Sequence, residues 1–168
     1  GKFKTDCLRK AAAVSAKTLR DAGIKNFATT LQLTPVKGLT LAEKSQIIAE
    51  GTILGLYDFK KYITVDKDKL KTVNKVTILE SKNVVAVKKG LAKGKILANN
   101  VNHIRDLVNE PADKVTPTYL ANEAKKMAKE SKGKIKATVF SKKEITKKGM
   151  GALIGVSKGS AEEPKFII

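Results

Sequence analysis

The longest helical stretch in the sequence constrains most strongly how this chain can fold. From Asn83 the residues can stay helical for about 28 positions until Pro111 ends the pattern, and Gly90 and Gly94 soften the helix. A helix this long in a small protein typically connects two packed bodies. We therefore expect an N-terminal α/β domain over 1–97, a linker helix over 98–112 and the start of a second domain over 113–168.

The first half of the sequence alternates between helical and strand spacing. Thr40 and Glu43 have the spacing of a capping box, in which a hydroxyl and a carboxylate satisfy two backbone donors. Gly51 and Gly55 weaken the helix that follows, so we expect them to let another element approach closely. The pattern predicts helices over 6–22 and 40–59, strands over 24–33 and 73–79, and a connection over 62–72.

The second half continues the alternation. Thr116 before Pro117 is typical of a helix start, and Ser141 with Glu144 repeats the capping-box spacing. The pattern predicts helices over 117–130 and 141–148 and strands over 135–139, 152–156 and 166–168. Strands that alternate with helices indicate an α/β fold with mainly parallel pairing. Because the last strand has no polar closing turn, we expect the domain that contains it to be incomplete.

The charge of the chain is strongly positive, at +18 from 34 basic and 16 acidic residues. Such a surplus attracts phosphate, but only Arg9, Arg20 and Arg105 are arginines, and aromatic residues make up 5% with no Trp. A lysine-rich solvated surface is therefore favoured, and a nucleic-acid-binding module stays open as the alternative. No apolar run is long enough to cross a membrane, and the single Cys7 forms no internal disulfide, so we expect a cytoplasmic protein.

Candidate motifs for chemistry are weak when taken alone. His103 has no second His or Cys partner for a metal, and the pair Asp66 and Asp68 lacks the glycine and distal Glu of a calcium loop. Glu162 and Glu163 are adjacent and point in different directions. The glycine-rich stretch 149–160 has the order helix, Gly-x-Gly, strand, whereas a dinucleotide fingerprint has strand first and helix last. The residues alone therefore predict no self-contained active site.

Several motifs together resemble the leucyl aminopeptidase family, also called cytosol aminopeptidases or M17. The segment 105–112, Arg-Asp-Leu-Val-Asn-Glu-Pro-Ala, is similar to the family's interdomain segment, and it is followed by Thr116 and Pro117. The stretch 149–160 and Pro164 match the pattern that leads into the family's catalytic sheet. The segments 8–24 and 51–59 resemble the family's N-terminal domain, so the likeness spans nearly the whole chain.

The resemblance implies a cytosolic, hexameric metallopeptidase that removes N-terminal residues, often leucine, from peptides with two divalent ions such as manganese or zinc. It implies an incomplete macro-domain-like αβα sandwich, joined by the long helix to the first β-α-β elements of the peptidase catalytic domain. The family's metal ligands and its catalytic Lys and Arg lie in motifs that this sequence lacks. We therefore assign no catalytic, cofactor-binding or metal-ligating residue and expect the chain alone to be inactive. A macro-type pocket for ADP-ribose rests on fold analogy only.

Overall fold

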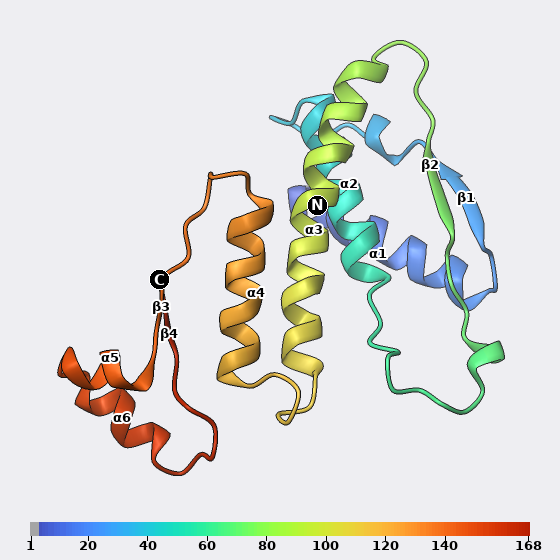
Figure 1. Cartoon of the computed structure of the whole chain (residues 1–168). Coiled ribbons are helices and arrows are strands. Elements are labelled where there is room, and N and C mark those ends of the chain that lie inside the picture. Colours follow the sequence, from blue (N-terminus) through green and yellow to red (C-terminus); the bar gives the residue numbers. More distant parts are fainter. Residues whose placement is uncertain (1–3) are drawn as a thin grey trace. The chain divides into compact units, whose positions relative to one another are not determined.

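The chain folds into two compact units, seen in a computed structural model that describes residues 4–168 except the side chain of Asp68. The first unit extends to Val108 and the second runs from Asn109 to Ile168 (Figure 1). The first unit contains α1 Thr5–Asp21, β1 Asn26–Thr29, α2 Leu41–Gly55, β2 Lys75–Ile78 and α3 Val84–Asn109, with single 3-10 turns at Leu31–Leu33 and Lys67–Lys69. The second unit contains α4 Pro117–Glu130, β3 Val139–Phe140, α5 Lys142–Lys147, α6 Gly151–Ser157 and β4 Phe166–Ile167. Helices and strands are interspersed along the chain, so the predicted α/β class is confirmed.

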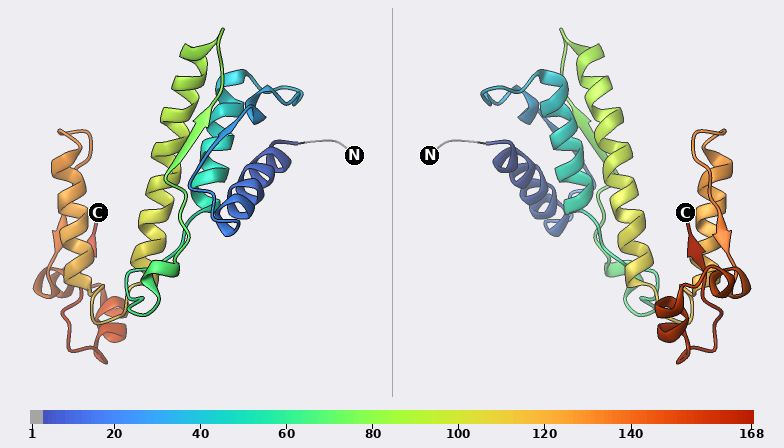
Figure 2. Two further views of the ribbon diagram at one scale, coloured as in Figure 1. Left: turned by 90° about the vertical axis from the view of Figure 1, so that its right-hand side faces the viewer. Right: turned by 90° about the vertical axis from the view of Figure 1, so that its left-hand side faces the viewer.

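Three helices and a two-stranded sheet form the first unit, and α2 lies between α1 and α3 (Figure 2). The strands β1 and β2 run parallel, with Asn26 opposite Lys75 and Thr29 opposite Ile78. A cluster of buried apolar residues lies between α1 and α2. It consists of Leu8, Ala12, Ile47 and Ile48, with Leu31, Val36, Leu39 and Ile78 packed against it.

Glycines let the three helices approach closely. A Cβ atom built on Gly51 of α2 would lie 2.4 Å from the carbonyl oxygen of Arg9 in α1. One built on Gly90 of α3 would lie 2.0 Å from the carbonyl oxygen of Ala42 in α2. The close approach predicted for the α2 glycines is therefore confirmed. Gly90 and Gly94 have the same role in α3, which the sequence analysis treated only as a softening of that helix.

The helix starts agree with the sequence predictions. Both capping pairs form: the Thr40 hydroxyl accepts from the backbone N–H of Glu43, and the Glu43 carboxylate accepts from the backbone N–H of Thr40. The Glu144 carboxylate accepts from the backbone N–H and the hydroxyl of Ser141. Thr116 accepts from the backbone of Tyr119 at the start of α4. No helix among residues 4–168 is long and apolar enough to span a bilayer.

The strands are shorter than predicted, for local reasons. The predicted strand 24–33 ends at Thr29, because the Thr29 hydroxyl accepts from the backbone of Leu31 and turns the chain into a 3-10 turn. The predicted strand 135–139 begins only at Val139, because the Ser131 hydroxyl accepts from the backbone of Ile135 and holds it in a turn. The pairing is also mixed: β1 and β2 are parallel, whereas β3 and β4 are antiparallel.

The strand predicted over 152–156 is wrong, because this stretch is the helix α6. A short apolar run fits a helix or a strand equally well by periodicity. Here Gly149 adopts a left-handed conformation at φ 69° that ends α5, and the backbone of Ile154 then bonds to the carbonyl of Met150. Leu153, Ile154 and Ser157 form the half-buried helical face, and Val156 is 85% exposed.

Candidate functional site

The described residues contain no metal-binding cluster. Among them, no group of three or more His, Cys, Asp or Glu side chains is arranged to hold an ion. His103 is exposed on α3, and Cys7 is exposed near the start of α1. Neither side chain is therefore part of a group of possible metal ligands among the described residues.

The remaining motifs considered in the sequence have local structural roles. Asp66 has a left-handed backbone at φ 53° and pairs with Lys69 at 2.8 Å. Glu163 pairs with Lys165 at 3.0 Å in the loop before β4. In the glycine-rich stretch 149–160, the glycines end α5 and lie within or after α6. None of these residues lies in an arrangement typical of acid–base catalysis or phosphate binding.

Two of the hollows in the first unit lie beside β2. One, of about 380 Å³, lies among α2, β2 and α3, and its lining is mostly apolar with Thr52 and Lys95 among the polar members. The other, of about 610 Å³, is a wide depression at the carboxyl end of β2 and is lined by Leu33, Leu41, Leu79 and residues 80–83. The carboxyl ends of parallel strands are the usual ligand edge of an α/β sheet, so the second hollow is the more informative one.

Polar groups near this second hollow are used to hold the backbone. Glu80 accepts from the backbone N–H groups of Lys82 and Asn83, and these two hydrogen bonds lower the pKa of its carboxyl below the ordinary value of 4.5. Gln32 is fully buried, and its Nε2 donates to the carbonyl of Leu79 at 2.6 Å. Its Oε1 has no hydrogen-bond partner in the described part of the chain. Glu80 therefore serves the start of α3.

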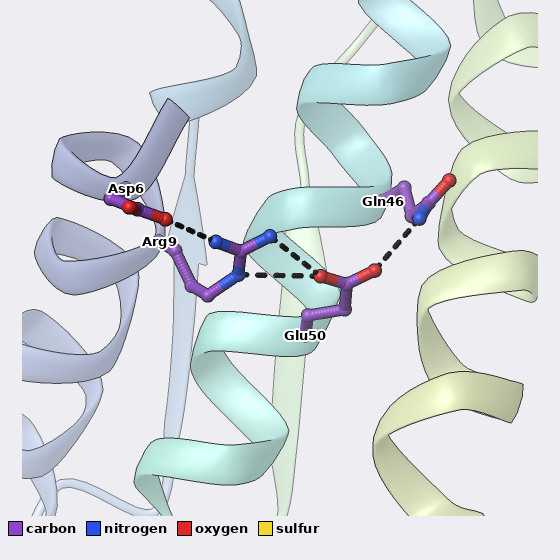
Figure 3. A network of polar contacts seen from close by, with 4 residues as sticks. All are labelled: Asp6, Arg9, Gln46 and Glu50. Atoms are coloured by element: carbon purple, nitrogen blue, oxygen red, sulfur yellow. Dashed lines mark hydrogen bonds and ion pairs between the residues drawn. The ribbon is translucent and has the colours of Figure 1, made fainter. Parts of the chain in front are cut away.

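A buried carboxylate joins α1 to α2 (Figure 3). Glu50 Oε2 accepts from Nε and Nη2 of Arg9 at 3.3 and 3.1 Å, and Glu50 Oε1 accepts from Gln46 at 2.7 Å. Arg9 also donates to Asp6 at 2.6 Å. Since both oxygens of Glu50 are occupied by hydrogen bonds, this network ties the two helices together rather than offering a free catalytic acid.

A second polar cluster lies where α3 passes the end of α2. The guanidinium of Arg105 stacks on the ring of Tyr57, 3.7 Å from its centre, and the Tyr57 hydroxyl donates to Asp106 at 2.8 Å. Sequence reasoning placed Arg105 and Asp106 in a family-like segment but missed their contact with Tyr57. Because Tyr57 lies about fifty residues before Arg105 and Asp106, no local sequence pattern indicates this contact.

Comparisons with known families match both parts of the chain. Residues 1–66 match the N-terminal domain of the cytosol aminopeptidase family, and residues 102–168 match the catalytic domain of the same family. The two matches occur in the family's own order along the chain.

Individual relatives and solved structures agree with the family matches. A probable cytosol aminopeptidase of Aquifex aeolicus is 36% identical over 99% of this chain and 32% of its own length, and one of Alkaliphilus metalliredigens is 37% identical over 99% and 33%.

Among solved structures, the bottromycin maturation enzyme BotP in complex with Mn gives a TM-score of 0.79 at 26% identity, over 98% of this chain and 32% of that one. A mutant of tomato leucine aminopeptidase gives a TM-score of 0.81 at 25% identity, over 96% of this chain and 32% of that one. The chain spans about a third of the length of these relatives. With two matched domains, consistent relatives and a shared fold, the chain belongs to the cytosol aminopeptidase (M17) family.

Proposed function

We propose that this chain is part of a metal-dependent aminopeptidase that removes N-terminal residues, often leucine, from peptides. The observation that carries the proposal is the presence of both family domains, in order, in one chain that aligns with aminopeptidases over 99% of its length. The proposal concerns the whole polypeptide, since the relatives are about three times as long as the aligned chain.

Divalent ions, manganese or zinc, are proposed to supply the chemistry of the whole enzyme. A pair of such ions activates a water as nucleophile and polarises the scissile carbonyl. The solved BotP complex contains Mn, which supports metal dependence in this family. The residues described here do not fit such a pair, since no three ligating side chains gather among them. We therefore derive no catalytic step from these residues and propose that the ligands lie in other parts of the polypeptide.

The proposed role of the chain is to provide the N-terminal domain and the start of the catalytic domain, and alone it is expected to be inactive. The test measures hydrolysis of a leucyl amide by the 168-residue chain with manganese or zinc, against a metal-free control. We expect no metal-dependent rate. A longer polypeptide that includes this chain and the remaining two thirds is expected to cleave the substrate only with metal. If the longer protein with metal did not cleave the leucyl amide, the aminopeptidase proposal would be contradicted. If the 168-residue chain cleaved it, the proposal that the chain alone is inactive would be contradicted.

The whole enzyme is proposed to assemble as a homo-hexamer and to bind peptide substrates. Light scattering of the longer polypeptide tests the hexamer, and a smaller assembly contradicts it. The alternative of a nucleic-acid-binding module gains no observation here. The arginines, which suit phosphate contacts best, each have partners inside the chain: Arg9 with Glu50, Arg20 with Asp21, and Arg105 with Tyr57. Binding to duplex DNA that disappears at moderate salt would reflect only the charge of +18.

A further inference from the structure

The last two turns of α3 are attached to the end of α2 by side chains rather than by an apolar core. Helix α2 ends at Gly55, and its final carbonyl groups lack partners within the helix. Arg105 donates to the carbonyl of Leu54 at 3.3 Å, and Asn102 donates to that of Ile53 at 3.4 Å. Side chains of α3 therefore cap α2 from outside.

Tyr57 completes this attachment. Its ring lies beneath the guanidinium of Arg105, and its hydroxyl donates to Asp106, the next residue of α3. Arg105 also donates to Asn102 at 3.2 Å, one turn earlier on the same helix. Four side chains thus form one connected group, in which a planar cation is held between a ring, an amide oxygen and a backbone carbonyl.

Apolar side chains contribute little on this part of the helix. Val101, Ile104 and Val108 are 47%, 55% and 77% exposed, Leu107 is half-buried, and the last fully buried residue of α3 is Ala98. Among the described residues of α3, none beyond Ala98 is fully buried, so the polar group carries much of that attachment.

The position of this group in the sequence gives it a role beyond ordinary packing. The match to the family's catalytic domain begins at residue 102, whereas the first structural unit continues to Val108. The seven residues 102–108 thus belong to one domain by sequence and to the other by contacts. Asn102, Arg105 and Asp106 all lie in this overlap.

We propose that Tyr57, Asn102, Arg105 and Asp106 form a junction lock, a set of positioning residues that keeps residues 102–108 helical and attached to α2. The lock fixes the point at which the chain leaves the first unit. Its loss frees the end of α3 through local opening while α1, α2 and the core between them stay folded. A merely stabilising contact would instead change the stability of the whole unit.

Amide hydrogen exchange of the 168-residue chain tests the proposal residue by residue. Arg105→Lys keeps the charge and loses the planar stack, and Tyr57→Phe keeps the ring and loses the bond to Asp106. Each is expected to speed exchange at residues 102–108 by roughly tenfold, while amides of α1 and α2 stay within about twofold of the parent. Tyr62→Phe, at a tyrosine that packs on Phe59 instead, is the matched control and is expected to leave the end of α3 unchanged.

Combining the two substitutions distinguishes a connected group from separate contacts. Because Arg105 and Asp106 both contact Tyr57, the double variant is expected to speed exchange by less than the product of the single effects. Unchanged exchange at 102–108 in both single variants would overturn the junction lock. Equal acceleration throughout the first unit would overturn it as well, because the contacts would then act on global stability.

Discussion

Replacement of Gly90 by Ala tests the close packing of α3 on α2 most directly. An added Cβ atom would lie 2.0 Å from the carbonyl oxygen of Ala42 and 3.0 Å from the side chain of Ser45. Ordinary contact begins at 3.4 Å, so the helices must separate by about 1.4 Å at this point. The added Cβ atom would meet backbone atoms of Ala42, which cannot move to another rotamer as a side chain can. The separation of the helices would loosen the packing of the buried residues Val87 and Ala98.

The expected cost follows from two opposing effects. Overpacking a close contact costs typically 1–3 kcal/mol, and a backbone clash this short belongs at about the upper end. Replacing Gly by Ala within a helix also stabilises the helix by about 1 kcal/mol, because Ala has the higher helix propensity. The net destabilisation of Gly90→Ala is therefore about 2 kcal/mol, which lowers the thermal midpoint of a unit this size by about 8 °C.

Thermal and urea unfolding followed by helical circular dichroism measure this loss. Asn99→Ala is the matched control, since Asn99 is exposed on the same helix and Ala there adds helix propensity of a few tenths of a kcal/mol without meeting α2. We expect the control to unfold at or slightly above the parent's midpoint. If Gly90→Ala matched or exceeded the stability of the parent, the close approach of the two helices would be refuted.

Three further predictions concern the polar contacts of the helices. Glu50→Ala leaves Arg9 without its buried carboxylate and is expected to lower the free energy of unfolding in urea by about 2 kcal/mol. This value is below that of a fully buried ion pair because Arg9 is partly exposed. A loss no greater than that of Asp6→Ala would contradict the role of Glu50 in joining α1 to α2. Thr40→Ala removes the hydroxyl that caps α2 and is expected to cost about 1 kcal/mol, with Thr40→Ser nearly neutral as its control. Backbone hydrogen bonds lower the pKa of the Glu43, Glu80 and Glu144 carboxyls below 4.5, so the stabilisation by these groups is complete above that pH and is lost as the pH falls through the lowered pKa values. A thermal midpoint that stays constant or rises with acidification below pH 4.5 would contradict this sign.

Most of the helices could be predicted from the sequence because their signals are local. Thr40 with Glu43, Thr116 with Pro117, and Ser141 with Glu144 each define a helix start within four residues of chain. Pro111 likewise indicated the end of α3 to within two residues, since the helix ends at Asn109. Capping and breaking depend on neighbouring residues, so these positions needed no knowledge of the tertiary structure.

Strands and the polar clusters could not be predicted as well, because they depend on distant partners. The bounds of β1 follow from its pairing with β2 and from the side-chain bond of Thr29, and α6 follows from the left-handed turn at Gly149. The contact of Tyr57 with Arg105 joins positions 48 residues apart. Periodicity along the chain carries no information about contacts between distant residues. The family resemblance indicated that Arg105 belongs to a recognisable segment but did not show which residues it contacts.

Helix α3 is attached to α2 by different physical means at its two ends. At the N-terminal half, Gly90 and Gly94 bring backbone against backbone, and this contact tolerates almost no added volume. At the C-terminal half, Arg105 and Asn102 reach α2 through long or polar side chains that can release and rebind. Backbone packing thus holds the N-terminal half of α3 on α2, and side-chain hydrogen bonds hold its C-terminal half. We therefore expect the last turns of α3 to open locally more readily than its start.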